Sequence, residues 1–374
     1  FRVASNFNTD TSGASSCDTY GMRDAVVAAI DGQVDFRNYS RILIVTPGNG
    51  ACTWAGTANV GCRAMSSNGD GEFNASVAWQ RAESMATRTA AVQLTTHELG
   101  HNLTLSHAGS RDFGTEALGA IGATGTLSEY GDPFSTMGAW NFGFYAASQA
   151  ANQLQWLGAG TNYTVVETSG TYTVQGYETR PAGVKALKVR RGTGNNSWLW
   201  LESRQNVGNY SSRLDPSAFR GALVHFEDTT TGNDSHLLDF TTGTAGFNDA
   251  PMPAGSSWSD PYSNLNVTVN SVSSAGMTVT VNYGSATCTA AAPTVTLSPV
   301  AASAEQGGTV RLALTVKNNS TQACAAESFA ITAAAPGGWT AKPATAALTL
   351  NPGQQLQTTI SVSVPTGFAL GTYA

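Results

Sequence analysis

Three histidines and one glutamate are concentrated in a short segment, THELGHNLTLSHAG, at residues 96–109. This segment holds three of the five histidines in the 374-residue chain. His97 and His101 are four residues apart, so on an α-helix they project from one face, where two imidazole nitrogens can bind one metal ion. Glu98, beside the first histidine, is placed to act as a general base on a water at the open metal position.

His107 can join this set only if the helix ends soon after His101. Six further helical residues would carry it about 9 Å along the axis and off the shared face. If the chain reverses, three histidines with a vacant fourth position give the His₃ arrangement of a catalytic zinc site. The two-histidine pattern alone is loose, and a helical His–Glu pair can equally be a solvated surface feature.

A second motif, EYGDPFSTMGAW at residues 129–140, supports the metal interpretation. The histidine pattern followed by this turn resembles the metzincin metallopeptidases. Among the metzincins, the chain is most similar to the gametolysin family of secreted metallopeptidases. The similarity rests on HELGHNL, on EYGD before STMG, and on the upstream CTWAG-to-VGC segment. The resemblance implies zinc bound by the three histidines, a general base at Glu98 and a supporting Met-turn at Met137.

Two positions depart from the metzincin pattern. Thr104 stands where metzincins usually have the glycine that turns the chain after the helix. A β-branched residue resists positive φ, so we expect the turn to be made differently, with Asn102 assisting, or His107 to approach along an altered path. Some metzincins also carry a tyrosine two residues after the methionine, whereas this chain has Ala139, and Tyr145 lies too far along to take that role. Stabilisation of the oxyanion is therefore left to the metal.

Composition excludes several classes of protein. Charged residues make up 12% of the chain, and 19 Lys and Arg stand against 25 Asp and Glu, so no basic surface for nucleic acid is expected. No apolar run is long enough to predict a membrane span. The chain begins at Phe1 without an apolar leader, so we expect a mature, secreted, monomeric protein whose signal and any pro-segment have been removed.

The five cysteines predict an oxidising compartment. Cys52 and Cys62 bracket a glycine-rich loop, and Cys288 and Cys324 lie in the last segment. The simplest interpretation is two local disulfides, with Cys17 left as a single thiol. The alternative is five reduced cysteines in the core.

The pattern of apolar and polar residues along the chain predicts three domains. Residues 1–160 mix helices and strands and are expected to form an α+β metzincin-type catalytic domain, with a twisted mixed sheet and an active-site helix. Residues 161–284 alternate apolar and polar residues in short runs, which predicts an all-β sandwich. Residues 285–374 are similar to the immunoglobulin-like β-sandwich modules of secreted bacterial hydrolases, and end where a further strand is expected.

Within the first domain, a helix over 18–31 is predicted from its apolar spacing and the capping position of Asp18. A buried strand is predicted at 41–48 and the active-site helix from Thr87. We nominate residues 75–83 as an edge strand against which an extended protein substrate could bind, with an ordinary internal strand as the alternative.

Calcium is considered as a second metal at two places. The segment from Asn68 to Glu72 alternates oxygen ligands but lacks the rest of a calcium loop, so a polar turn is preferred. Aspartates in the second domain could also bind calcium, although solvated loop carboxylates are more common: Asp228, Asp234, Asp239 and Asp249. His225 and His236 are interpreted as structural.

Together these patterns predict a secreted zinc endopeptidase that hydrolyses peptide bonds of extracellular proteins. Two alternatives stay open at this point. One is a non-catalytic adhesin or carbohydrate-binding protein stabilised by a structural metal, and the other is a zinc hydrolase acting on a cell-wall amide.

Overall fold

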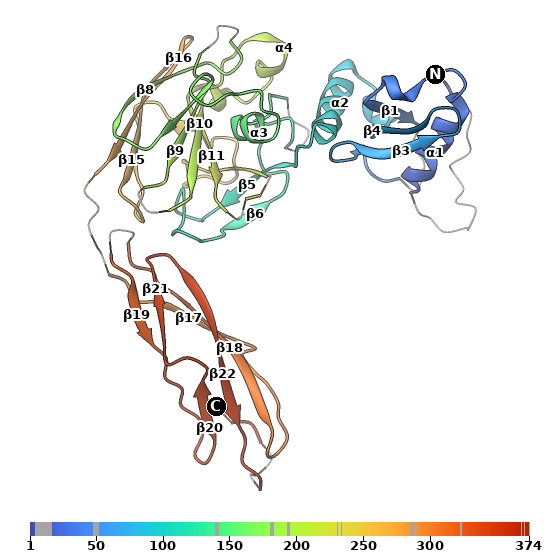
Figure 1. Ribbon diagram of the computed structural model, residues 1–374. Coiled ribbons are helices and arrows are strands. Elements are labelled where there is room, and N and C mark those ends of the chain that lie inside the picture. Colours follow the sequence, from blue (N-terminus) through green and yellow to red (C-terminus); the bar gives the residue numbers. More distant parts are fainter. Residues whose placement is uncertain are drawn as a thin grey trace.

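The fold was analysed on a computed structural model. It describes residues 1–3, 17–47, 52–138, 142–179, 183–192, 195–229, 231–232, 234–284, 288, 290–321, 324–367, 369 and 371–373. Over these residues the chain is mostly β-sheet, arranged in several sheets with few helices (Figure 1). None of the described helices combines the length and the apolar character that a membrane crossing requires.

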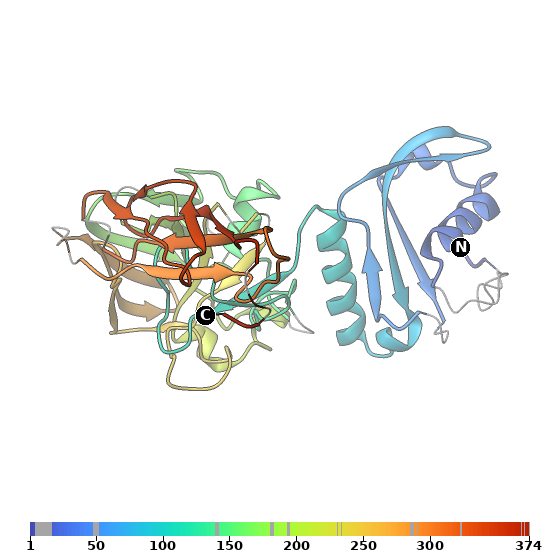
Figure 2. The ribbon, with the colours of Figure 1, turned by 90° about the horizontal axis from the view of Figure 1, so that it is seen from below.

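The N-terminal part is a four-stranded mixed sheet between two helices. Strand β1 (Arg41–Thr46) runs parallel to β4 (Gly71–Arg81), while β2 (Gly56–Ala58) and β3 (Arg63–Ser67) pair antiparallel with β4. Helices α1 (Thr19–Ile30) and α2 (Arg88–Asn102) lie on opposite sides of this sheet, as Figure 2 shows. The predicted first helix and its cap are confirmed, since the Asp18 side chain accepts a hydrogen bond from the Gly21 amide at 2.8 Å.

The two faces of β4 explain why one sheet can hold both helices. Side chains alternate across a strand, so Val77 and Trp79 pack with Met22 of α1 in a buried cluster. On the other face, the Gln80 side chain accepts a hydrogen bond from Thr95 of α2 at 3.0 Å. Helix α2 is therefore fixed to the sheet by polar contacts as well as by packing.

The nomination of residues 75–83 as an edge strand is wrong. Residues 78–80 of β4 pair with β2 on one side, and residues 76–81 pair with β1 on the other. β4 is interior because β1 and β2 satisfy its backbone from both sides. The strand at the free edge beside α2 is instead β2.

The larger β-region is built from two packed sheets. An eight-stranded sheet has the order β6-β5-β12-β11-β10-β9-β7, with β13 also paired to β11, and a four-stranded sheet has the order β14-β15-β16-β8. Apolar side chains from both sheets, among them Leu201, Val224, Val267 and Val279, form one buried cluster between them. The bounds of these strands are β5 (Ala108–Asp112), β6 (Thr126–Ser128), β7 (Tyr163–Val166), β8 (Gly170–Gln175), β9 (Ala186–Arg190), β10 (Trp198–Glu202), β11 (Gly221–Glu227), β12 (Ser235–Leu237), β13 (Met252–Pro253), β14 (Ser257–Ser259), β15 (Leu265–Ser273) and β16 (Gly276–Tyr283).

This sheet joins strands from both sides of residue 160. β5 pairs in parallel with β12, so the segment directly after the histidines is part of the same sheet as residues 221–237. The helices α3 (Ala147–Asn152) and α4 (Gly208–Ser211) lie outside the sheets. The division at residues 160 and 284 stays a prediction, but strand pairing continues across the first of these positions.

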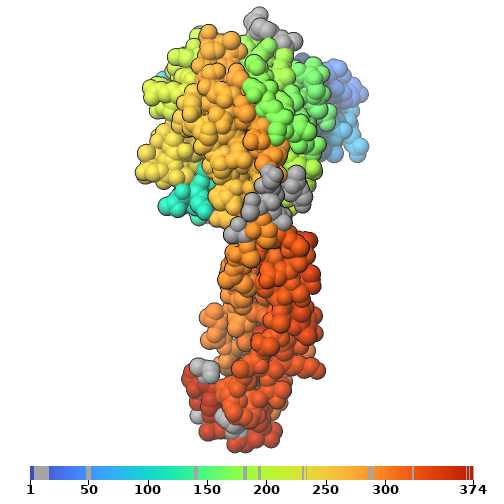
Figure 3. Space-filling view, turned by 90° about the vertical axis from the view of Figure 1, so that its left-hand side faces the viewer, coloured from blue at the N-terminus to red at the C-terminus, as the bar shows by residue number. Residues whose placement is uncertain are grey.

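The C-terminal module is a smaller pair of sheets that projects from the rest of the molecule (Figure 3). A small buried cluster that includes Leu314, Leu350 and Ile360 lies between the two sheets. Its strands are β17 (Thr294–Ser298), β18 (Thr309–Lys317), β19 (Glu327–Ala330), β20 (Thr340–Pro343), β21 (Ala347–Leu350) and β22 (Gln355–Ser363).

Helix α2 ends in a tight reversal at Thr104. The Thr104 amide donates to the His101 carbonyl at 2.8 Å, and the Leu105 amide donates to the Gly100 carbonyl at 3.0 Å. These two bonds form a Schellman motif, whose turning residue normally has left-handed backbone angles. Thr104 has φ 79°, so the expectation that threonine would avoid this conformation is wrong.

Asn102 does not make the turn either. Its side-chain amide donates to the carbonyls of Asn59 at 3.0 Å and Val77 at 3.1 Å. It therefore holds the end of the helix on the N-terminal sheet. The reversal depends on the Schellman bonds and on burial of Leu105, which is 0% exposed.

The disulfides differ from the predicted pairs at the N-terminal end. Cys17 is bonded to Cys52 across 35 residues, and Cys62 is a free, exposed cysteine. Cys52 lies in the core cluster beside Cys17, whereas the extended strand β2 separates it from Cys62. The predicted bond between Cys288 and Cys324 is confirmed.

The strained turn predicts a stabilising substitution. Thr104→Gly is expected to raise the free energy of unfolding by about 1 kcal/mol, because glycine adopts positive φ without the steric penalty of a β-branched residue. Chemical denaturation of the full chain measures this. The same substitution at Thr126, in the extended strand β6, is the control and should destabilise; a loss of stability at Thr104 would contradict the strain argument.

The disulfide assignment predicts unequal effects of three serine substitutions. Cys17→Ser and Cys52→Ser are each expected to lower the free energy of unfolding by about 3–4 kcal/mol, because the closed loop is long. Cys62→Ser should leave stability within about 0.5 kcal/mol of wild type. Peptide mapping without reduction checks the pairing directly, and a linked Cys52–Cys62 peptide would refute it.

Candidate metal centre

Helix α2 carries two of the three histidines and the glutamate on its last two turns. It begins where the Thr87 side chain accepts a hydrogen bond from the Ala90 amide at 3.1 Å. The Schellman turn then directs residues 105–107 back beside the helix. As a result, His97, His101 and His107 each offer one ring nitrogen, and these atoms lie within 4.8 Å of one another.

One nitrogen of each imidazole is held by the protein. His97 Nδ1 lies 2.8 Å from the Thr136 carbonyl oxygen, and His101 Nδ1 lies 2.8 Å from the Leu105 carbonyl oxygen. His107 Nδ1 lies 2.7 Å from Glu129 Oε1. In each case the acceptor favours a proton on Nδ1, which leaves Nε2 as a free lone-pair donor.

Burial also favours neutral rings. Burial lowers the pKa of His97 to about 4, against a smaller opposing effect of its hydrogen bond to Thr136. Burial likewise lowers the pKa of His101. Since a metal binds the neutral imidazole, both rings are prepared as ligands at neutral pH.

The predicted Met-turn lies directly beneath the helix. Met137 is 0% exposed and packs with Leu105 and Ala108, and its carbonyl accepts a hydrogen bond from the Ala108 amide at 2.9 Å. A Cβ at Gly100 would lie 2.3 Å from Met137 Sδ. Glycine at this position of the histidine motif therefore allows the methionine to approach the helix closely.

Glu98 faces a cavity beside the histidines. It is 3% exposed, and its Oε2 atom has no hydrogen-bond partner among the described residues. Burial raises the pKa of Glu98 to about 8. Strand β2 passes close by, since a Cβ at Gly56 would lie 2.5 Å from Glu98 Oε1. A buried carboxyl group with an unused oxygen is suited to proton transfer inside this cavity.

The EYGD turn contributes two residues near the histidines that motif spacing alone does not identify. Glu129 binds His107, as described above, and the Tyr130 ring centroid lies 3.9 Å from that of His107. Asp132 Oδ2 lies 2.9 Å from His225 Nε2, and both side chains are 0% exposed. The sequence signal was the EYGD motif itself, used above for the family resemblance but not for individual roles.

Two cavities flank the histidines. One, of about 420 Å³, is bordered by His97, Glu98 and Tyr130 together with strand β2. The other, of about 470 Å³, lies beside His101 and His107 and reaches the edge strand β6 at Leu127. The three histidines thus lie between two cavities. This arrangement suits a ligand that extends to both sides of the histidines.

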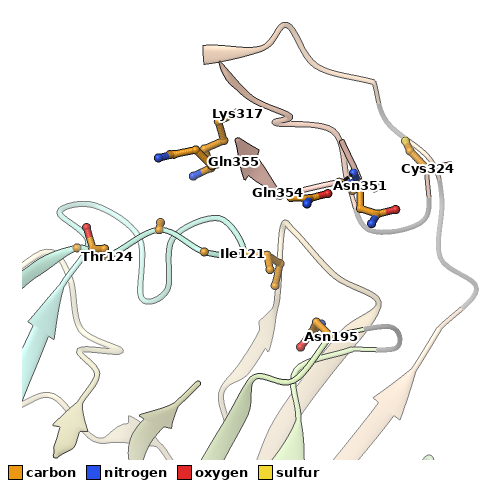
Figure 4. Close-up of a pocket in the computed structure, with 13 residues that line it drawn as sticks. Ile121, Thr124, Asn195, Lys317, Cys324, Asn351, Gln354 and Gln355 are labelled. Carbon is orange, nitrogen blue, oxygen red and sulfur yellow. Dashed lines mark hydrogen bonds between the residues drawn. The ribbon is translucent and has the colours of Figure 1, made fainter. Parts of the chain in front are cut away.

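A larger cavity of about 990 Å³ lies elsewhere, between the loop at residues 121–125 and the C-terminal module (Figure 4). Amide side chains, including Asn195, Asn351 and Gln354, and the lysine Lys317 face it. No histidine, aspartate or glutamate lines it among the described residues. It therefore lacks the acid–base groups that the histidine site offers.

Neither of the two places considered for calcium forms a metal site in the described residues. The carboxylate of Asp70 accepts a hydrogen bond from the Phe36 amide at 2.8 Å, so it supports a polar turn. Asp239 binds the backbone and hydroxyl of Thr241, and Asp249 binds Thr244. Of the described residues, only the three histidines group closely enough to hold a metal ion.

Tyr145 and Ala139 are the two residues considered above at and near the position of the metzincin tyrosine. The Tyr145 hydroxyl donates to the Thr96 carbonyl at 2.9 Å, so it supports helix α2 beside His97. Ala139 lies outside the described residues.

Comparisons with known families bear on two parts of the chain. Residues 2–171 match the family model of gametolysin peptidase M11, and residues 304–374 match that of the NPCBM-associated, NEW3 domain of alpha-galactosidase. No curated protein and no solved structure matches significantly. The resemblance predicted from the motifs is confirmed: residues 2–171 are similar to the gametolysin metallopeptidases, and residues 304–374 are similar to the NEW3 domain.

Proposed function

We propose that the chain is a secreted zinc endopeptidase of the metzincin type, which hydrolyses peptide bonds of extracellular proteins. The observation that carries this proposal is the convergence of three histidine nitrogens beside a buried glutamate in an open cavity. The gametolysin match supports a metallopeptidase independently of this geometry. Secretion is supported by the two disulfides, which persist in oxidising compartments.

The residues present fit zinc. Three imidazoles with their Nδ1 atoms held by the protein are the donor set of a catalytic zinc site, and no thiolate closes the fourth position among the described residues. Bound zinc would polarise the scissile carbonyl and lower the pKa of its water. Glu98 would lose its proton more readily beside such a positive charge, although its burial alone raises its pKa.

Glu98 then performs both proton transfers. It accepts a proton from the attacking water and delivers it to the leaving amine as the tetrahedral intermediate collapses. Its second oxygen is available for this because no protein group binds it in the described part of the chain. A purely structural metal site, as in the adhesin alternative, has no use for such a carboxylate.

The substrate is proposed to bind as an extended strand along the free edge of β2. This edge lies against Glu98, and Trp54, Ala55 and Gly56 border the cavity in front of it. Backbone hydrogen bonds to an exposed strand edge hold a peptide in register regardless of its sequence. The cavities on both sides of the histidines would take substrate side chains on either side of the cleaved bond.

Glu98→Gln is expected to keep zinc and to lose hydrolysis. Glutamine has nearly the same shape but cannot accept the proton, so kcat should fall by about 10³-fold or more. Activity on a denatured protein substrate and zinc content by atomic emission are measured on the same sample. Retained activity of the variant would refute the proposed base. If neither the wild type nor the variant cleaved any protein or peptide, the endopeptidase proposal would be refuted.

Glu129→Ala tests the hydrogen bond that orients His107. Loss of this partner is expected to weaken zinc affinity by roughly 10-fold, at the low end for such partners because the Glu129 side chain is 71% exposed. Competition with a coloured zinc chelator measures the affinity. Glu116→Ala, which removes a carboxylate bound to Tyr262 outside the histidine site, is the matched control. Equal affinity of both variants would contradict the orienting role.

A further inference from the structure

The turn that carries Tyr130 is fixed at both ends. The Gly131 amide donates to the Ser128 carbonyl at 3.1 Å, and the Asp132 amide donates to the Ala108 carbonyl at 3.2 Å. On one side Glu129 is bonded to His107, and on the other the buried Asp132 carboxylate is bonded to His225. The backbone of Tyr130 is therefore held in a defined position next to the histidines.

The side chain of Tyr130 lies beside the histidines. Its ring centroid lies 3.9 Å from that of His107 and 6.2 Å from that of His97. Tyr130 also borders the same cavity as Glu98, where a substrate carbonyl would have to lie. The residue is 43% exposed, so a ligand entering the cavity can reach it.

The hydroxyl groups of the two tyrosines near the histidines are used differently. The Tyr145 hydroxyl donates to the Thr96 carbonyl and supports the helix. The Tyr130 hydroxyl donates no hydrogen bond within the part of the chain that the structure describes. An exposed aromatic residue beside the histidines, with an unused donor in the cavity that Glu98 borders, is suited to bind an oxygen of the substrate.

We propose that Tyr130 is a catalytic residue whose hydroxyl donates a hydrogen bond to the carbonyl oxygen of the scissile peptide as that oxygen gains negative charge. This inference rests on the proposed endopeptidase function. The hydroxyl keeps its proton throughout, and the bond strengthens as the carbonyl becomes an oxyanion. Some metzincins have a tyrosine two residues after the Met-turn methionine, where this chain has Ala139, which offers no such donor. Here the EYGD turn, which precedes the Met-turn in sequence, supplies the donor instead.

A donor that acts mainly in the transition state affects kcat more than KM. Tyr130→Phe keeps the ring against His107 and removes only the hydroxyl. We expect kcat to fall by about 100-fold, KM to stay within about threefold, and zinc content and Tm to match wild type. Tyr39→Phe, at an exposed tyrosine just before strand β1, is the matched control and should match wild type in all four.

A phosphinic peptide gives a readout that does not depend on turnover. Its tetrahedral phosphinate imitates the charged intermediate, so its Kd, measured by calorimetry on the zinc-loaded full chain, should rise in Tyr130→Phe by the same factor as kcat falls. Unchanged kcat, or faster turnover, would overturn the inference. A lower kcat with an unchanged phosphinate Kd would assign Tyr130 a structural role and also overturn it.

The same experiment separates this inference from the function on which it rests. If wild type and Tyr39→Phe cleave peptides and Tyr130→Phe cleaves them equally well, only the role of Tyr130 fails. If the zinc-loaded wild type cleaves no peptide and does not bind the phosphinate, the endopeptidase proposal fails, and the role of Tyr130 fails with it.

Discussion

The reversal of the chain at Thr104 is the constraint on which the histidine site depends. A helix can present His97 and His101 on one face, but only a sharp turn after Asn102 brings His107 to the same point. Two Schellman bonds and the burial of Leu105 hold that turn, although its central residue is β-branched and has φ 79°. Strain of about 1 kcal/mol at such a position is tolerated only where the surroundings determine the conformation.

The surroundings that fix the turn also fix the ligands. Leu105, which completes the turn, accepts the hydrogen bond from His101 Nδ1 and packs on Met137. The Met-turn supplies the Thr136 carbonyl, which accepts the hydrogen bond from His97 Nδ1. Strand β5 begins directly after His107 and continues into the large β-region, so the third histidine is anchored by a sheet. Helix end, Met-turn and sheet therefore support one another around the proposed zinc position.

Much of this site could be predicted from sequence, because its signals are local. The spacing of His97 and His101 follows from helix geometry, and the Met-turn motif is contiguous. The pairing of Cys17 with Cys52 was missed because it depends on where α1 packs against the sheet, which no local pattern specifies. The sequence left open whether residues 75–83 form an edge or an internal strand for a similar reason, since β2 and β1 are selected as partners of β4 by tertiary packing. Glu129 and Tyr130 were not assigned because their roles arise only when β6 folds back along β5.

The central claim concerns the identity and ligands of the metal. X-ray absorption spectroscopy at the zinc edge, on the purified full chain with its metal content measured, tests it most directly. The account predicts one zinc per chain with three imidazole ligands at about 2.0–2.1 Å and no sulfur ligand. Fewer than three imidazoles, a thiolate ligand at about 2.3 Å, or a protein that binds no zinc would contradict it.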